Sequence, residues 1–312
     1  MAGTYAHIIL ADSLCRQQDS IPDLPSSIRQ ALTYHRSFCK FGAVGPDCPY
    51  AVLSTGATGY AKLMHYHRTA DFVRFAIPKI HPMNFGRSNT RKCLAWILGY
   101  AAHLVTDLTV HPVIARKFGA YAASSRNRKR HRLCELHQDA YLFRREFGTD
   151  IVGSDFLRFS EFDACAEGGN LHKLSRPIAG LWTHCLNAYP RTETRKYVRL
   201  PKASLKLDVW YATFVKVFRD VVTKGNPFLQ DLAIGYPHSS AVDSVYTRKL
   251  PTASGVEIDY DGLFDHAREN VKQAWRELAL ALDSNQPELF TLKNASLDSG
   301  LDDATGQPVF VV

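Results

Sequence analysis

The sequence has no long hydrophobic run, and its first residues do not read as a secretory leader, so we expect neither a membrane protein nor a secreted one. Its longest nearly apolar stretch, Cys93 to Val105, has thirteen residues and contains His103, whereas a membrane-spanning helix needs about 20 apolar residues. The N-terminus lacks a basic region and reaches His7 and Asp12 early, which is unlike a secretory signal peptide. We therefore expect no transmembrane segment and a cytoplasmic location.

Paired cysteines are also missing. The seven cysteines are odd in number, widely scattered and without a CxxC pair. This pattern excludes a disulfide framework and a thiolate zinc knuckle, and it favours a reducing compartment.

The composition is that of a globular protein, and its periodicity is helical. Hydrophobic residues make up 46% of the 312 residues and charged residues 22%, so the chain is not of a disordered or fibrous class. Apolar residues recur at intervals of three and four, which predicts amphipathic helices. The predicted helices cover Tyr5–Cys15, Gly59–Ile77, Thr90–His111, Lys129–Phe147, Ala203–Val222 and Asp261–Asp283. We expect an all-α fold, a multi-helix bundle with long connecting loops.

Strand patterns are scarce, and the breaks between helices do not divide the chain into domains. Only Val256–Tyr260 and Val309–Val312 are short strand candidates. Residues 225–255 contain three prolines and read as a long loop. Because the segment after this loop has one good helix and could not bury a core alone, we expect a single domain over residues 1–312.

Histidines are concentrated in the first half of the chain, nine of the thirteen lying before residue 140. In HLVTDLTVH, the side chains of His103, Asp107 and His111 fall within about 80° of one another on a helix. The flanking residues are apolar, so this stripe should face the interior, where imidazoles and carboxylates need partners or a metal. Pro112 predicts that the helix ends or kinks at His111.

A second pair of ligand types follows in HRLCELHQDAYLF. His131 and Glu135 are four residues apart, about 40° on a helix, while His137 lies on a different face. Imidazole and carboxylate ligands without thiolates suit a catalytic zinc site. Asp47 and His65 add two more candidate ligands, whereas His67 reads as a solvated residue and Asp139 as either a partner behind the ligands or a surface residue.

These motifs together resemble the zinc-dependent phospholipase C family, whose fold is shared with P1- and S1-type nucleases. They are AHIILAD, GAVGPDCPY, LMHYHRTADF, GYAAHLVTDLTVHPVI and HRLCE, in that order over residues 5–145. The resemblance implies one zinc held by Asp47, His65, His103 and Asp107. It implies a second zinc held by His111, His131 and Glu135.

The resemblance also implies a third zinc, held by His7 and a bridging Asp107. In secreted relatives this ion also binds an N-terminal tryptophan, and this chain has no tryptophan before Trp96. After removal of Met1, the α-amine of Ala2 is a candidate substitute. Two zinc ions are therefore expected, with the third depending on the processed N-terminus.

The chemistry expected of this site is hydrolysis of phosphodiesters by metal-activated water, with Asp47 as the candidate base. The net charge of +8 and the basic run at 126–132 favour an anionic substrate, either a phospholipid head group or nucleic acid, and allow peripheral contact with an anionic membrane. Two alternatives stay open: a nuclease on the same fold, and a zinc-stabilised binding protein without turnover.

Overall fold

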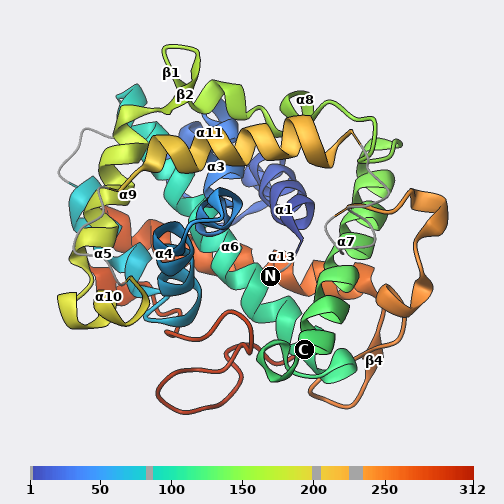
Figure 1. The fold of residues 1–312 in the computed structure, drawn as a ribbon. Coiled ribbons are helices and arrows are strands. Elements are labelled where there is room, and N and C mark those ends of the chain that lie inside the picture. The colour runs from blue at the N-terminus through green and yellow to red at the C-terminus, as the bar shows by residue number, and fades with distance from the viewer. Residues whose placement is uncertain (1–2, 82–86, 199–204, 225–234) are drawn as a thin grey trace.

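The computed structural model describes residues 3–81, 87–198, 205–224 and 235–312, and in these ranges the chain is predominantly helical (Figure 1). The expected all-α class is confirmed. The helices are α1 Thr4–Arg16, α2 Ser26–Tyr34, α3 Arg36–Gly42, α4 Thr55–Tyr66, α5 Asp71–Ile80, α6 Ser88–Phe118, α7 Ser125–Phe147, α8 Phe156–Ser160, α9 Arg176–Ala188, α10 Arg191–Tyr197, α11 Leu207–Val217 and α13 Tyr260–Ser284.

Short elements connect these helices. The 3-10 turns are η1 Gln18–Ser20, η2 Gly45–Val52, η3 Tyr121–Ala123, η4 Phe162–Cys165, η6 Ser239–Ala241, η7 Ser244–Tyr246 and η8 Pro287–Leu289, and the π-helical turn η5 Phe218–Val222 extends α11. Two antiparallel pairs, β1 Ala166–Glu167 with β2 Asn170–Leu174 and β3 Leu250–Pro251 with β4 Glu257–Ile258, form the sheets of the described residues.

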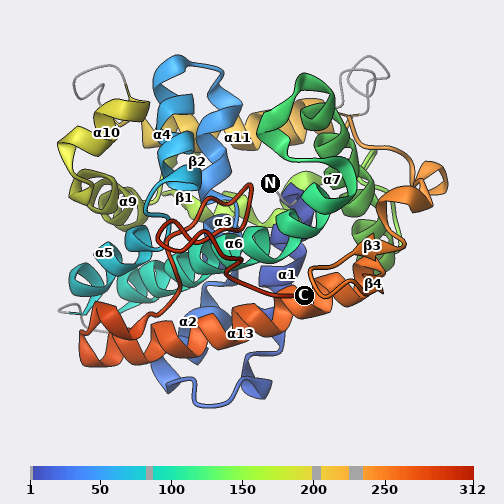
Figure 2. The ribbon, with the colours of Figure 1, turned by 90° about the horizontal axis from the view of Figure 1, so that it is seen from below.

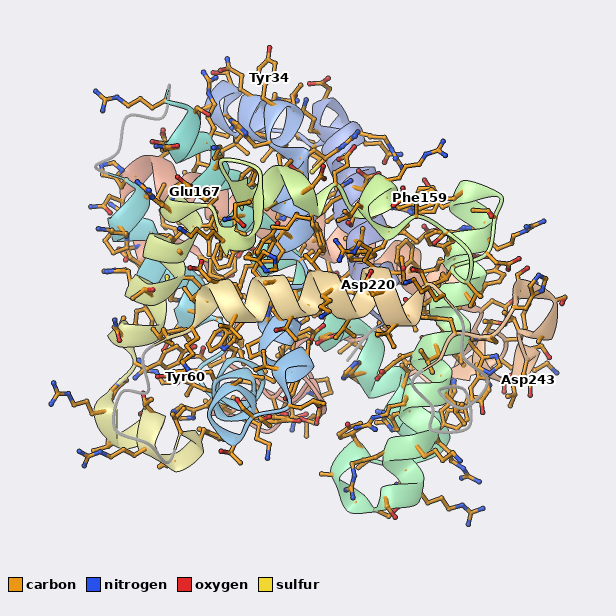
Figure 3. All side chains as sticks on the ribbon, turned by 45° about the horizontal axis from the view of Figure 1, so that its top comes forward. Tyr34, Tyr60, Phe159, Glu167, Asp220 and Asp243 are labelled. Atoms are coloured by element: carbon orange, nitrogen blue, oxygen red, sulfur yellow. The ribbon has the colours of Figure 1, made fainter. Side chains whose placement is uncertain are left out.

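Helix α6 is the central element of the bundle, and α1, α2, α3, α5, α7, α9 and α13 pack around it (Figure 2). The Trp275 indole of α13 donates a hydrogen bond to the Leu98 carbonyl of α6, 2.9 Å away. By length and composition α6 alone among the described helices could cross a membrane, but its apolar window is wholly buried inside the fold. Aromatic and aliphatic side chains fill the space between the helices (Figure 3).

Two glycines allow α3 and α6 to touch. A Cβ on Gly99 would lie 1.9 Å from the Cys39 carbonyl oxygen, and a Cβ on Gly42 would lie 2.0 Å from that of Trp96. Both obstacles are backbone atoms, so relief requires the helices to separate. The glycines therefore fix the distance between α6 and the helix that precedes η2.

Replacing Gly99 by alanine should destabilise the protein by about 3 kcal/mol, because overpacking at a backbone contact displaces whole elements. The measurement is the urea midpoint of unfolding. The control is Gly180→Ala in α9, where a Cβ meets no atom within 4 Å and alanine favours a helix by up to about 1 kcal/mol. Equal midpoints for the two variants would contradict this packing.

Several sequence expectations need correction. The predicted helix Gly59–Ile77 is two helices, α4 and α5, because the chain turns over 67–70, where Arg68 has a left-handed φ of 48°. The predicted end at His111 is wrong, since α6 runs on through Pro112 to Phe118. Pro112 has no backbone N–H to donate to the helix. The helix tolerates this loss because the surrounding residues of α6 are buried against neighbouring elements.

The two strand candidates, the long loop and the single domain are the remaining sequence expectations. Val256–Tyr260 contains only the two-residue strand β4, and Val309–Val312 is not a strand. Within 225–255, the described part contains η6, η7 and β3, while 225–234 lie outside the described residues. One buried cluster joins residues from Tyr5 to Leu297. A single domain over the full chain stays a prediction.

Candidate metal centre

Helix α6 supplies three side chains of the centre from one stripe. The Asp107 carboxylate lies 3.3 Å from His103 Nε2 and 3.5 Å from His111 Nε2. All three side chains are at most 1% exposed. Because α6 continues past Pro112, His111 keeps the helical phase of the other two and faces the same carboxylate.

Other elements bring further ligand types to this stripe. His7 of α1 places Nε2 at 3.3 Å from Asp107 Oδ1, and its ring stacks on that of His103 with centroids 4.1 Å apart. Asp47 of η2 lies 3.2 Å from His65 Nε2 of α4. Among the described residues, two buried groups have ligand atoms within 4.8 Å of one another: His7, His103 and Asp107, and Asp47, His65 and His103.

Backbone carbonyls behind the rings determine which ring nitrogens face the centre. His103 Nδ1 donates a hydrogen bond to the Ala43 carbonyl at 2.9 Å, and His65 Nδ1 donates one to the Ala61 carbonyl at 2.7 Å. A carbonyl only accepts, so each Nδ1 carries a proton; Nε2 of the neutral His103 ring then has a lone pair, while Nε2 of His65 lies 3.2 Å from Asp47 Oδ1. This is how metal-binding histidines are oriented in proteins.

The electrostatics keep His103, Asp107 and Asp47 in the protonation states that bind metals, whereas burial, which would lower the pKa of His65, is outweighed by Asp47, which raises it. Burial, with His7 alongside, lowers the pKa of His103 to about 3. Burial would raise the pKa of Asp107, but His111, His103 and His7 hold it well below its usual value. Burial opposes ionisation of Asp47 as well, yet His103 and His65 lower its pKa. A neutral imidazole and two carboxylates therefore meet at neutral pH.

Helix α7 carries His131 and Glu135, which belong to neither of the two groups although Glu135 interacts electrostatically with Asp107. The His131 ring is buried, and its Nε2 donates to the Gly119 carbonyl at 2.6 Å. Desolvation raises the pKa of Glu135 to about 7. Neither residue belongs to a three-ligand group among the described side chains, so the expected second zinc set of His111, His131 and Glu135 stays a prediction. The candidate ligand Ala2 lies outside the described residues.

Several buried nitrogens of the centre lack hydrogen-bond partners. Within the described ranges, His7 Nδ1, His103 Nε2 and His131 Nδ1 make no hydrogen bond. A buried polar atom without a partner costs free energy comparable to a lost hydrogen bond. These nitrogens belong to predicted zinc ligands, so the donor set fits zinc.

Asp139, on α7, anchors the helix that carries His7. Its side chain is fully buried and accepts hydrogen bonds from the backbone amides of Tyr5 at 2.9 Å and Ala6 at 2.7 Å, and from the Tyr236 hydroxyl at 2.8 Å. Burial raises its pKa to about 6 although these donors lower it. The surface alternative considered for Asp139 is therefore wrong. His137 instead lies on the outer side, where its Nδ1 accepts from the Asp243 amide.

The histidine two residues from His65 has a different partner. His67 ends α4 and places Nε2 at 2.9 Å from Glu193 of α10. It is partly buried beside this carboxylate, not solvated as the sequence suggested. His65 is the member of this pair that faces Asp47.

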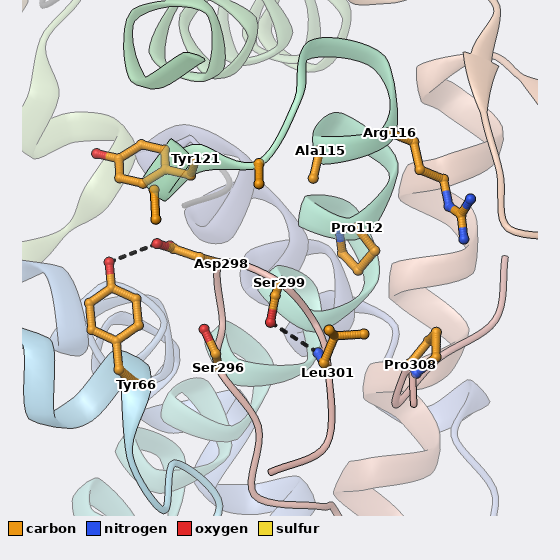
Figure 4. Close-up of a pocket in the computed structure, with 12 residues that line it drawn as sticks. Tyr66, Pro112, Ala115, Arg116, Tyr121, Ser296, Asp298, Ser299, Leu301 and Pro308 are labelled. Carbon is orange, nitrogen blue, oxygen red and sulfur yellow. Dashed lines mark hydrogen bonds between the residues drawn. The ribbon is translucent and has the colours of Figure 1, made fainter. Parts of the chain in front are cut away.

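A cavity of about 470 Å³ borders the centre (Figure 4). It is lined by Tyr66, Pro112, Ala115, Arg116, Ala120, Tyr121, Ala122, Ser296, Asp298, Ser299, Leu301 and Pro308. Tyr66 follows His65, and Pro112 follows His111. Asp298, which the acidic C-terminal sequence predicted to be solvated, is largely buried and accepts a hydrogen bond from the Tyr66 hydroxyl at 2.7 Å.

The fold and this centre define a class: an all-helical protein that gathers buried imidazoles and carboxylates around one long central helix. The sequence signature of zinc-dependent phospholipase C matches residues 6–222, and the chain belongs to that family. Searches of the curated proteins and of the solved structures found no match to the chain. The family and the buried histidine and aspartate groups support a zinc-dependent, phospholipase C-like role.

Proposed function

We propose that the protein is a zinc-dependent hydrolase of phosphodiesters, with water as the nucleophile. The observation that carries this proposal is the convergence of His7, Asp47, His65, His103 and Asp107 in buried groups. Buried imidazoles and carboxylates cost free energy unless they have partners. A divalent ion is a suitable partner for a cluster whose rings are oriented by backbone carbonyls.

We assign a set of ligands to each proposed zinc ion. Asp47, His65, His103 and Asp107 would hold one zinc, and His111, His131 and Glu135 a second. His7 and Asp107 would hold a third. When bound, zinc supplies positive charge that stabilises phosphodiester oxygens and makes water a nucleophile near neutral pH. Two or three ions fit this donor set, and their number is part of the proposal.

Asp47 is the residue that we assign to proton transfer. It lies on η2 rather than on a long helix, its side chain is 8% exposed, and His65 orients its Oδ1 at 3.2 Å. Its lowered pKa keeps it a carboxylate at neutral pH. It therefore accepts hydrogen bonds from a water molecule at the centre and can take up its proton during attack.

The substrate is proposed to be anionic because basic side chains flank His131, a predicted zinc ligand. The run 126–132 on α7, which flanks His131, contains five exposed cations, and none of them forms an ion pair within the described residues: Arg126, Arg128, Lys129, Arg130 and Arg132. Such a surface attracts phospholipid head groups, an anionic membrane or a nucleic-acid backbone. A nuclease activity on the same fold is the second candidate, and this basic surface is the observation that favours it.

A cytoplasmic location is proposed with the same activity. All seven cysteines are free and buried, which suits a reducing compartment. The measurement that checks it is fluorescence microscopy of the tagged full-length chain together with its distribution between cell fractions.

The experiment is turnover of three substrates with and without added zinc: a choline phospholipid, single-stranded DNA and bis(p-nitrophenyl) phosphate. We expect zinc-dependent hydrolysis that Asp47→Asn lowers on the order of 10³-fold, because the amide cannot take a proton and binds metal weakly. The matched control is Asp163→Asn, an exposed aspartate of η4, which should leave turnover unchanged.

The outcomes separate the alternatives. Preference for the phospholipid supports the phospholipase, and preference for DNA supports the nuclease. If zinc raises the melting temperature but all three substrates stay at background, the protein is a zinc-stabilised binding protein and the hydrolase proposal fails.

A further inference from the structure

The C-terminal segment lies against the metal centre although it is outside the matched residues 6–222. The Leu297 amide donates a hydrogen bond to the carbonyl of His65 at 2.8 Å. Thr69 donates its hydroxyl to the Ala295 carbonyl at 2.9 Å. These contacts attach residues 295–297 to the end of α4, directly behind a predicted ligand.

A second anchor attaches the same segment to α6. Gly300 has a φ of 68°, and a Cβ at this position would lie 2.3 Å from Pro112 Cγ and 3.1 Å from the Leu108 carbonyl oxygen. Only glycine satisfies both the left-handed backbone and the close approach. The segment is thus fastened to the turn of α6 that carries His111, and Asp298 lies between the two anchors.

Asp298 faces His111 from the side opposite Asp107. Its Oδ1 is 4.0 Å from His111 Nδ1, while His111 Nε2 is 3.5 Å from Asp107 Oδ1. The Asp298 side chain is 13% exposed, and its Oδ2 accepts the Tyr66 hydroxyl (Figure 4). The imidazole therefore lies between two carboxylates, and the Asp298 carboxylate approaches Nδ1 to within an ion-pair distance of 4.0 Å rather than a hydrogen bond.

We propose that Asp298 is a positioning residue of the metal centre, which holds His111 so that its Nε2 faces the ion. A carboxylate on the side of the second nitrogen favours the ring orientation in which Nδ1 carries the proton, and on closing to hydrogen-bond distance it would strengthen the ligand, as carboxylate partners of zinc-binding histidines do. Tyr66 fixes the carboxylate in turn. The C-terminal segment then contributes a residue that positions a metal ligand. The inference rests on the proposed zinc ligand His111.

The test is zinc affinity of the full chain, measured by competition with a chromogenic chelator, for the wild type and Asp298→Asn. We expect the variant to bind its weakest zinc about 10- to 100-fold less tightly, whereas the metal-free proteins should melt at similar temperatures. Asp298→Glu should recover part of the affinity. The matched control is Asp302→Asn, since Asp302 is in the same segment and bonds only within its own exposed turn.

The absorption spectrum of the cobalt-substituted protein distinguishes a change in ligand position from a loss of folding. Cobalt substituted for zinc should show an altered visible absorption spectrum in Asp298→Asn, because the ligand field at His111 changes, and a smaller change in Tyr66→Phe. Unchanged zinc affinity and an unchanged cobalt spectrum in Asp298→Asn would overturn the proposal. Neither readout depends on turnover, so a protein that binds zinc without hydrolysing phosphodiesters would fail the proposed function and still test this inference.

Discussion

His103→Ala will lose zinc and phosphodiester hydrolysis together. His103 belongs to both three-ligand groups, so removing its imidazole removes one ligand from each group. We expect the bound zinc to fall by at least one ion per chain and kcat/KM to fall on the order of 10³-fold or more. The measurements are elemental analysis of the purified protein and the rate on bis(p-nitrophenyl) phosphate.

The control for this variant is His184→Ala, an exposed histidine of α9, which should retain zinc and rate. Because alanine also leaves the Ala43 carbonyl without its donor, His103→Gln is a second variant that preserves more volume. Wild-type zinc content and turnover in both folded variants would show that the assigned centre is wrong.

Asp139→Ala will destabilise the protein by about 3 to 5 kcal/mol. The substitution leaves the buried amides of Tyr5 and Ala6 without an acceptor and removes the partner of the Tyr236 hydroxyl, and each unsatisfied group costs about 1–3 kcal/mol. The helix that positions His7 begins at these amides, so zinc binding should weaken as well. Urea unfolding of the metal-free protein measures the first effect, and chelator competition the second.

Two comparisons make the Asp139 experiment specific. Tyr236→Phe removes one hydrogen bond and should cost about 1 kcal/mol. Asp283→Ala, at an exposed position near the end of α13, should cost less than about 0.5 kcal/mol. If Asp139→Ala were as stable as Asp283→Ala, the capping contacts would not hold α1 in place.

The sequence predicted the features that depend on local spacing. Helical periodicity was enough for the all-α class, because amphipathic stripes in consecutive segments need one another for burial. The interval of four between His103, Asp107 and His111 was enough to place them on one stripe. The stripe even continues where Pro112 predicted a break, since tertiary packing preserves the helix.

The features that the sequence missed depend on contacts between distant residues. Asp139 reaches α1 across more than 130 positions, and Asp298 meets Tyr66 across 232. No local pattern identifies the partners of either aspartate, and the sequence left Asp139 between a partner of the ligands and a surface residue, because these roles come from how α7 and the C-terminal segment pack. A buried carboxylate among apolar helix positions was the one available signal for Asp139, since such a group requires partners.

The central claim is that the buried histidines and aspartates exist to bind zinc. Its most direct test is elemental analysis of wild-type protein purified without added metal. We expect about two to three zinc ions per chain. Less than one zinc per chain, with no uptake when zinc is titrated in, would contradict it.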